Sequence, residues 1–234
     1  MGAVNDYFVF NGVSSKEFGA LVSGYDTFNT PERDESVVDV PGRNGSVVFD
    51  NGRWKNTPIA YKALIYKDFD QNYVALSNFF ASISGYHRLE DTMEPDVFRI
   101  ARRTGEIEQN MHGNYDASGF VIHFDCKPQK FLKSGEAAIE YTDDGSIYNP
   151  TQYTALPLIR VYSAGTLQIG SNTLIISGVD EYVDIDCDLQ NAYKGTVNCN
   201  SNVSGTYPKL VAGENNILLN TISKIEIIPR WWML

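Results

Sequence analysis

Hydrophobic and polar positions alternate most clearly between residues 37 and 65. Two Asn-Gly dipeptides, Asn44-Gly45 and Asn51-Gly52, divide this stretch into three short runs rich in β-branched and aromatic residues. Asn and Gly tolerate the positive φ angles of tight hairpin turns, so the pattern predicts a three-stranded β-meander. In the last run, one side of the strand carries Ile59, Tyr61, Ala63 and Ile65. Because the other side is only partly polar, we expect this sheet to pack against another layer.

One helix is predicted between Asp68 and Ser84. Large apolar residues recur there at intervals of four and three, the period of a helix with one buried side. This stripe consists of Phe69, Tyr73, Leu76, Phe80 and Ile83, widened by Val74 and Phe79. Asp68 is a suitable N-cap, and Gly85 can adopt the left-handed conformation that ends a helix. We expect the helix to lie as a lid on the sheet.

The segment from Arg88 to Gly113 is charged and contains two weak strand patterns, at 97–101 and 106–108. Such a pattern favours a protruding hairpin or arm. Clear alternation returns at 120–127, and Pro128 ends that strand.

The second half of the chain consists of short strand patterns separated by Gly, Asn and Ser, without helical periods. It therefore predicts a second antiparallel sandwich. The small, polar segment 134–149 places the domain boundary near residue 135. The expected fold is mainly β: an N-terminal β-sandwich with one packed helix (1–135), then a second β-sandwich (136–234). We also consider packing of the last residues back on the first domain.

The composition is that of an ordinary globular protein, with 43% hydrophobic and 21% charged residues among 234. The net charge of −10 argues against nucleic-acid binding, because phosphate recognition needs clustered Lys and Arg. The only basic cluster in the sequence is Arg99, Arg102 and Arg103. For this cluster we favour a solvated loop or a protein contact.

The three cysteines, Cys126, Cys187 and Cys199, are odd in number and form no Cys-x-x-Cys pair. Neither a zinc site nor a disulfide framework is therefore indicated, and we expect reduced, buried thiols. The first residues lack the apolar core of a signal peptide, and no run approaches the roughly 18 apolar residues of a membrane span. We expect synthesis and folding in the cytosol, without membrane insertion.

Asp184, Asp186 and Asp188 alternate with apolar residues, which places three carboxylates on one face of a strand. A calcium site and a glycosidase pair are two alternatives for such carboxylates. The calcium-loop pattern is absent, however, and the favoured interpretation is a solvated strand face. The sequence contains no phosphate-binding loop, serine nucleophile elbow or zinc-binding helix motif. We therefore expect no catalytic residue, cofactor or metal, and no enzyme activity.

Several aromatic and basic residues are candidates for contacts with other subunits. Adjacent residues of a strand face opposite ways, so one of Trp231 and Trp232 can fill a core while the other meets a partner. Of these two interpretations, simple core closure is the favoured one. Trp54 is expected at a hairpin tip, where burial within one subunit is hard to arrange. The candidate interface residues are Arg43, Asn44, Trp54, Arg99, Arg102, Trp231 and Trp232.

Segments spread over the whole chain resemble one family, in the same order. They lie at 10–15, 40–46 (VPGRNGS), 124–136 (FDCKPQKFLKSGE), 148–162, 185–193, 207–217 and 225–232. Together they are similar to the distal tail (Dit) proteins of long-tailed, non-contractile bacteriophages, although 88–118 carries no specific match.

This resemblance implies a galectin-like second sandwich and a ring, usually of six copies, at the distal tip of the tail. Family members join the tail tube to the tail-associated lysin or baseplate hub and anchor receptor-binding proteins. They are assembled in the cytoplasm of the bacterial host, and phage DNA passes through the ring without specific binding. We also expect part of the negative charge to line the lumen and repel DNA phosphates.

The alternative function is a carbohydrate-binding module that recognises bacterial surface glycans, motivated by the galectin-like second half. Against it, no Trp or His cluster occurs between Leu156 and Ser223. The tyrosines of this half are scattered along the sequence: Tyr153, Tyr162, Tyr182, Tyr193 and Tyr207. Self-assembly into a hexamer favours the ring, whereas selective glycan binding favours the module.

Overall fold

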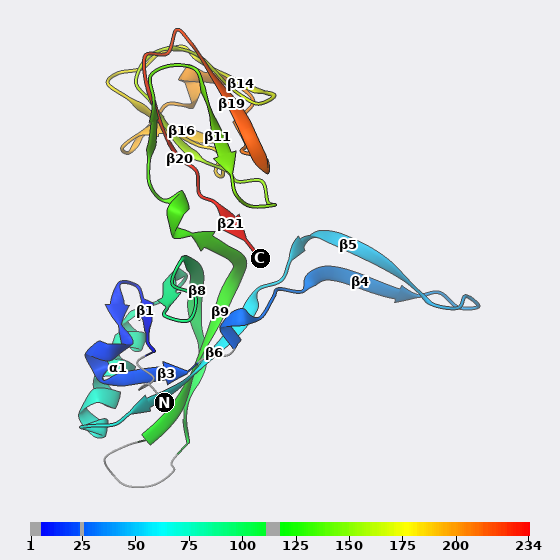
Figure 1. The fold of residues 1–234 in the computed structure, drawn as a ribbon. Coiled ribbons are helices and arrows are strands. Elements are labelled where there is room, and N and C mark those ends of the chain that lie inside the picture. The colour runs from blue at the N-terminus through cyan, green and yellow to red at the C-terminus, as the bar shows by residue number, and fades with distance from the viewer. Residues whose placement is uncertain (1–5, 24–25, 111–117) are drawn as a thin grey trace. The chain divides into compact units, whose positions relative to one another are not determined.

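The structure is a computed structural model that describes residues 6–23, 26–110 and 118–234. These residues form mainly β-strands, with one α-helix, and divide into two compact units, 1–130 and 131–233 (Figure 1). The prediction of a mainly β chain with one helix is confirmed. The first five residues, on which the signal-peptide prediction depends, and residues 111–113 of the predicted arm lie outside the described residues.

The first unit is built on a curled antiparallel sheet in the order β2-β1-β7-β8-β9-β6-β3. Its strands are β1 (Phe8–Phe10), β2 (Val13–Ser14), β3 (Ala20–Ser23), β6 (Thr57–Ile65), β7 (His87–Asp91), β8 (Val97–Asn110) and β9 (Ser118–Leu132). The alternation predicted for the third run is confirmed, because Ile59, Tyr61, Ala63 and Ile65 are all buried. They join a cluster of rings from Phe8, Phe10, Phe80 and Phe124, which meet in edge-to-face and tilted arrangements.

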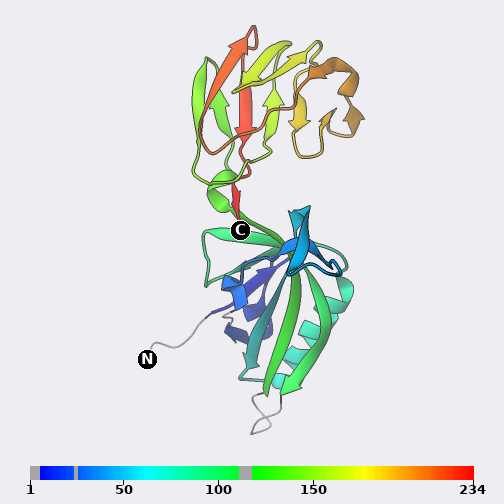
Figure 2. The same ribbon diagram turned by 90° about the vertical axis from the view of Figure 1, so that its right-hand side faces the viewer.

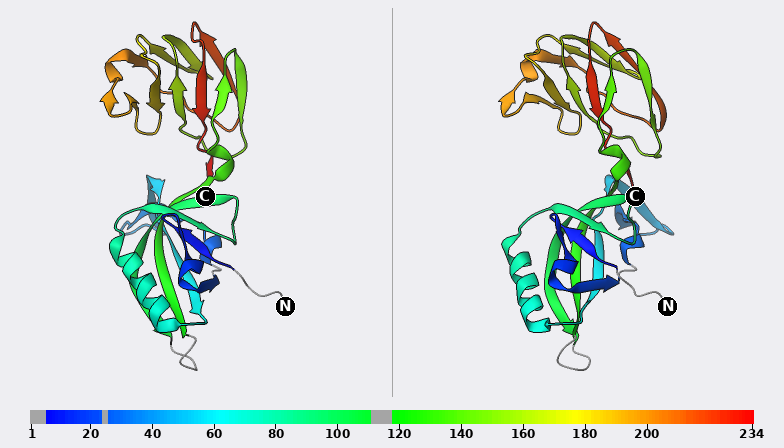
Figure 3. Two further views of the ribbon diagram at one scale, coloured as in Figure 1. Left: turned by 90° about the vertical axis from the view of Figure 1, so that its left-hand side faces the viewer. Right: turned by 60° about the vertical axis from the view of Figure 1, so that its left-hand side comes forward.

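The predicted helix is α1 (Phe69–Ser82), which packs on this sheet (Figure 3). Phe69, Leu76 and Phe80 are buried, whereas Val74 is 57% exposed and lies outside the apolar stripe. Asp68 occupies the N-cap position, but its side chain makes no capping hydrogen bond because its backbone is left-handed, with φ of 49°. Among the described residues, no helix has the length and apolar character needed to cross a membrane.

The predicted three-stranded meander is wrong in one respect. β4 (Arg33–Asp39) and β5 (Ser46–Trp54) pair only with each other and form a separate two-stranded sheet, here called the ribbon (Figure 1). Asn51-Gly52 is not a turn but lies within β5, where the register with β4 shifts and Gly52 has φ of 73°. Gly52 therefore adopts its positive φ in a β-bulge and not in a hairpin turn. β6 instead pairs with β3 and β9.

The prediction of a protruding arm between Arg88 and Gly113 is also wrong for the described part of that segment. Apart from the connection at 92–96, its residues up to Asn110 belong to β7 and β8, which pair with each other inside the curled sheet. Leu89 and Ala101 are completely buried. Asp91 and Arg99 are buried on the same side of the strands and lie 3.9 Å apart, whereas Phe98 and Ile100 lie on the opposite, partly exposed side. Because charged residues occupy buried positions and apolar residues occupy partly exposed ones, the strand pattern in the sequence is weak.

The second unit is a sandwich of two antiparallel sheets, as predicted (Figure 2). One sheet has the order β10-β20-β12-β15-β16-β17 and the other β11-β19-β13-β14-β18. The strands of the six-stranded sheet are β10 (Ile139–Tyr141), β12 (Leu158–Val161), β15 (Val183–Asp186), β16 (Asn191–Lys194), β17 (Val197–Asn198) and β20 (Ile225–Ile228). Those of the five-stranded sheet are β11 (Gly145–Asn149), β13 (Gly165–Ile169), β14 (Asn172–Ile176), β18 (Val203–Gly205) and β19 (Gly213–Asn220). Aliphatic residues from both sheets form one core, and β21 (Trp232–Met233) pairs with β9.

Candidate functional site

The ribbon and its turn carry several large apolar residues that are exposed: Val37, Val38, Val40, Val48 and Phe49. The two faces of the ribbon differ, because side chains alternate along each strand. One face carries Val38 opposite Val47 and Ser36 opposite Phe49. Val38 is 47% exposed and Phe49 is 57% exposed. Since these four side chains carry no charge, we call this side the apolar face of the ribbon.

The other side of the ribbon is the acidic face. Val37 pairs with Val48 there, but the neighbouring cross-strand pairs are Glu35 with Asp50 and Asp39 with Ser46. Carboxylates surround the two valines, so this face suits contact with water. On the apolar face, the polar neighbours lie toward the root, where Asn51 donates to Ser36 at 3.4 Å and Arg53 pairs with Asp34.

Ion pairs hold the root of the ribbon. Arg33 donates two hydrogen bonds to Asp50, at 2.9 and 2.6 Å, and Arg53 contacts Asp34 at 2.5 Å. The hydrogen bond from Arg33 lowers the pKa of the Asp50 carboxyl. The Arg33 guanidinium also lies 4.9 Å from the centre of the Trp54 ring. Trp54 is therefore at the root, opposite Arg33, and not at a hairpin tip as expected, because the bulge at Asn51-Gly52 does not reverse the chain.

The tip of the ribbon carries the predicted residues Arg43 and Asn44. Both are exposed, in a turn closed by the hydrogen bond from the Arg43 amide to the Val40 carbonyl, at 3.1 Å. Gly42 supplies the positive φ of 79° that this turn requires. The tip is thus accessible to another molecule.

A cavity of about 480 Å³ lies where the two strands of the ribbon separate, between residues 29–32 and 55–58. Thr57, which lines it, is 6% exposed, and its hydroxyl is the one buried side-chain oxygen or nitrogen without a hydrogen-bond partner in the described part of the chain. The last rung before the strands separate is the hydrogen bond from the Lys55 amide to the Glu32 carbonyl, at 2.9 Å.

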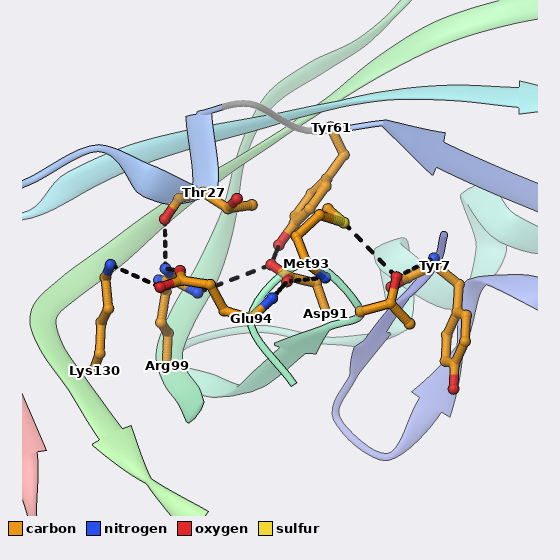
Figure 4. Close-up of polar contacts among 9 residues, drawn as sticks. Tyr7, Thr27, Tyr61, Asp91, Met93, Glu94, Arg99 and Lys130 are labelled. Carbon is orange, nitrogen blue, oxygen red and sulfur yellow. Dashed lines mark hydrogen bonds and ion pairs between the residues drawn. The ribbon is translucent and has the colours of Figure 1, made fainter. Parts of the chain in front are cut away.

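Arg99 lies inside the first unit, in a polar network shown in Figure 4. It is only 3% exposed, donates to the Thr27 carbonyl at 2.5 Å and pairs with Glu94, which also contacts Lys130 at 3.1 Å. The structure thus separates Arg99 from the surface cluster in which the sequence placed it. Its contact with Thr27 fixes the short helix η2 (Asp26–Phe28), which leads into the ribbon.

The same network includes two groups that the sequence did not single out. Asp91 accepts a 2.6 Å hydrogen bond from the Tyr61 hydroxyl and also accepts from the amides of Met93 and Glu94 (Figure 4). Burial, together with the neighbouring Asp91 charge, raises the pKa of Tyr61. Tyr61 was predicted as a core residue, but no periodicity in the sequence shows that its hydroxyl meets a carboxylate 30 residues away.

Arg102 remains at the surface, with half of its side chain exposed, and binds Asp125 at 2.9 Å. Asn56 donates to the same carboxylate and to the Tyr86 hydroxyl, so this group ties the base of the ribbon to β9. Arg102 is therefore available for a protein contact.

The tryptophans near the end of the chain differ in burial. Trp231 is 4% exposed and belongs to the core of the second unit. Trp232 stacks on Tyr153, with ring centres 4.5 Å apart, and donates to the Thr154 carbonyl at 3.0 Å. Core closure thus explains Trp231, whereas Trp232 is partly exposed.

The prediction of a solvated strand face for the three aspartates is wrong for two of them. Asp184 and Asp186 are 6% and 5% exposed, and only Asp188 is exposed. Arg160 binds both oxygens of Asp184, and Arg230 binds both oxygens of Asp186, at 2.7 to 3.0 Å. The arginines come from distant segments of the chain, which is why the sequence pattern did not reveal them.

These pairs compensate the charges of the two buried aspartates. Burial raises the pKa of Asp186, but the hydrogen bonds from Arg230 and from two backbone amides outweigh burial and lower it overall. The hydrogen bonds to Asp184 raise the pKa of Arg160. No group of three or more His, Cys, Asp or Glu side chains is arranged to hold a metal ion in the described residues.

Comparison with known proteins gives matches of structure only. Neither protein-family models nor curated proteins match the sequence. The structure is similar to the crystal structure of the Dit protein of phage SPP1, described as a paradigm of the hub adsorption apparatus in phages that infect Gram-positive bacteria. The TM-score is 0.75 at 13% sequence identity, and the match covers 98% of this chain and 99% of the SPP1 chain.

Two further matches are chains from the phage p2 baseplate in its activated conformation, one with Sr and one with Ca. Their TM-scores are 0.50 and 0.51, at 9% and 10% identity, and each covers 95% of this chain and 97% of the other. At these identities the likeness concerns the fold, and it extends over both units.

Proposed function

On the premise that this chain has the fold of a phage distal tail protein, we propose that it is a structural hub protein of a phage or prophage tail tip. The observation that carries this proposal is the match over nearly the full length of both chains, at a TM-score of 0.75. Both units and the connection between them are included in that match. The proposed role is structural and not catalytic.

The ribbon supports self-assembly as the basis of this role. A two-stranded ribbon alone in water is marginally stable, and exposed apolar residues on a strand pair invite another chain. Here Val38 and Phe49 are 47% and 57% exposed on the apolar face, and among the described strands β4 and β5 pair only with each other. A head-to-tail contact with a closing rotation would cover this face in every copy and produce a ring.

The finer features of the proposal come from the family resemblance. They are a ring of six copies, a connection between the tail tube and the tail-associated lysin or baseplate, and anchorage of receptor-binding proteins. Arg43, Asn44 and Arg102 are exposed and remain candidates for contacts in such a ring. Arg99 and Trp231 are buried within their own units, so they would contribute to the stability of those units and not to contacts between copies. DNA would pass through the lumen without specific binding.

The proposal is tested by measuring the mass of the purified chain in solution, combined with low-resolution electron microscopy. We expect a closed ring with a mass six times that of the monomer of 26.2 kDa. A protein that stays monomeric up to concentrations on the order of 100 μM, far above ordinary protein–protein dissociation constants, would contradict self-assembly as the basis of its role.

A further inference from the structure

The first unit contains three Asn-Gly pairs, and the structure places them in different surroundings. They are Asn11-Gly12, Asn44-Gly45 and Asn51-Gly52. Glycine has no side chain to keep its backbone nitrogen away from Cγ of the preceding asparagine, so this pair of residues is suited to an attack of that nitrogen on the side-chain amide. Such an attack removes the amide without an enzyme. Which pair can react depends on whether its backbone and its hydrogen bonds allow the two atoms to approach.

Asn11-Gly12 is held in a conformation that separates the reacting atoms. The two residues form the turn between Phe10 and Val13, which pair with each other. Asn11 has a left-handed backbone, with φ of 50°, and its amide donates to the Arg88 carbonyl at 2.9 Å. In this conformation ψ is about +47°, so the next nitrogen lies roughly anti to Cβ across the Cα–C bond. The Gly12 nitrogen is therefore turned away from the Asn11 side chain.

Asn51-Gly52 is held by hydrogen bonds within the ribbon. The Gly52 amide donates to Oδ1 of Asp50 at 2.7 Å. This nitrogen is the one that would attack, and its bond to a carboxylate fixes both its proton and its direction. The Asn51 side chain donates to the Ser36 hydroxyl at 3.4 Å and makes a further hydrogen bond with Asp34. Both reacting groups of this pair are thus already engaged.

Asn44-Gly45, at the tip of the ribbon, has neither kind of restraint. The hydrogen bond from the Arg43 amide to the Val40 carbonyl closes the turn before Asn44, and β5 begins only at Ser46. Asn44 is exposed, and its φ is negative. Within the described part of the chain, neither the Asn44 side chain nor the Gly45 amide makes a hydrogen bond. Apart from its chain neighbours, no atom lies within 4 Å of the position that a Cβ on Gly45 would occupy.

We propose that Asn44 is the one of these three asparagines that deamidates spontaneously in the folded chain, with water as the only co-reactant. The Gly45 nitrogen gives its proton to a base in the solvent and forms a bond to Cγ of Asn44, while the bond from Cγ to Nδ2 breaks. Nδ2 takes up a proton and leaves as ammonia. Water then opens the cyclic imide at either carbonyl, so the product is an aspartate or an isoaspartate, and no oxidant or reductant takes part.

The reaction changes what the tip of the ribbon offers to another molecule. A carboxylate replaces the neutral amide next to the exposed residue Arg43, so a negative charge is added beside this cation. An isoaspartate also adds a methylene group to the backbone of the turn, beyond the last strand pair of Asp39 with Ser46. The inference does not rest on the proposed hub function, because it concerns the chemistry of one turn within a single copy.

The test follows deamidation of the full chain by peptide mass spectrometry, at a concentration at which light scattering shows only monomers. The chain is incubated in mildly alkaline buffer, either folded or unfolded in guanidinium chloride, and fragment spectra assign each change to one asparagine. In the folded chain we expect Asn44 to react at least about tenfold faster than Asn51, because the hydrogen bond from Gly52 to a charged acceptor must first break. Asn11 should also remain slower than Asn44. In the unfolded chain we expect comparable rates at all three asparagines, because each is followed by glycine.

A matched pair of variants tests whether hydrogen bonding protects Asn51. Asp50→Ala removes the acceptor of the Gly52 amide, whereas Asp39→Ala removes a carboxylate of the same face of the ribbon that accepts from the Ser46 hydroxyl instead. We expect Asp50→Ala to raise the deamidation rate of Asn51 about tenfold and Asp39→Ala to leave this rate unchanged.

Three results would overturn the proposal. In the first, Asn44 stays unmodified in the folded chain while it reacts in guanidinium chloride. In the second, Asn11 or Asn51 reacts as fast as Asn44 in the folded chain. In the third, Asn51 reacts no faster in Asp50→Ala than in Asp39→Ala.

Discussion

Replacing Phe49 by Ala should weaken the contact between copies without affecting the fold of either unit. Phe49 lies on the apolar face of the ribbon, and it belongs to neither hydrophobic core. It has a large exposed fraction, 57%, for a residue on a strand. If a second copy covers this face, as proposed, the ring loses apolar contact area in Phe49→Ala at every interface.

The size of the effect follows from the exposed fraction. A phenylalanine contributes roughly 200 Å² of apolar surface, so an exposed fraction of 57% leaves roughly 110 Å² for a partner to cover. At about 25 cal/mol per Å² the whole of this area corresponds to about 2.8 kcal/mol, and because alanine retains part of it, the loss is about 1.5–2.5 kcal/mol per interface. Each interface should therefore associate roughly 10- to 60-fold more weakly.

The assay is mass photometry or light scattering over a dilution series, from which the concentration for half-assembly is read. The matched control is Val48→Ala. Val48 is the neighbouring residue of the same strand, has a similar exposed fraction of 54%, and lies on the acidic face of the ribbon. We expect Phe49→Ala to shift half-assembly to a concentration roughly 10- to 60-fold higher, the range worked out above, and Val48→Ala to shift it much less.

The midpoint of thermal unfolding should be the same for monomeric Phe49→Ala and the monomeric unmodified chain, since no core contact is lost. Equal shifts for the two variants would show that the apolar face has no special part in assembly. An unchanged half-assembly concentration in Phe49→Ala would refute the reasoning, because an apolar area of this size cannot be lost from an interface without a measurable effect.

Two further predictions concern the titratable groups. The folded state lowers the pKa of Asp186, so this carboxylate stabilises the second unit above its unfolded pKa of about 3.9, and the contribution is lost as the pH falls through the lowered value. Arg230→Met should therefore reduce the free energy of unfolding at pH 7 by about 2 kcal/mol. This is less than the loss expected for a fully buried ion pair, because the Arg230 side chain is 31% exposed. The variant should also show a weaker pH dependence of urea unfolding below about pH 4. Burial raises the pKa of Cys126 and of Cys187 to about 12, whereas Cys199 is partly exposed. At pH 8, a thiol reagent should modify Cys199 alone in the folded chain and all three cysteines after unfolding.

Each of these predictions has a result that contradicts it. An Arg230→Met variant with the same acid dependence as the unmodified chain would show that the Arg230 pair does not set the pKa of Asp186. Rapid modification of Cys126 or Cys187 in the folded chain, identified by peptide mass spectrometry, would show that their burial is not maintained in solution.

The amino-acid sequence alone determined the local features of this protein. Alternation along β6 identified its buried side, and the four- and three-residue spacing from Phe69 to Ile83 identified α1. Both patterns depend on which side of one element faces a core, and this information lies within a few neighbouring residues. The resemblance of short motifs to distal tail proteins also agreed with the fold that the comparison found.

The tertiary structure decided which elements meet. Asn44-Gly45 and Asn51-Gly52 have the same turn chemistry, yet one lies in the turn of the ribbon and the other in a bulge, because the pairing of β6 with β3 and β9 leaves β5 to β4 alone. Arg99 and Arg102 are three residues apart, but one is buried against Thr27 and the other is at the surface.

The same distinction holds for the ion pair between Arg160 and Asp184 in the second unit. Asp184 is buried because Arg160, 24 residues earlier, pairs with it across two strands. Such pairing depends on strand order and register, which are set by contacts between distant parts of the chain and leave no periodic signal in the sequence around either residue.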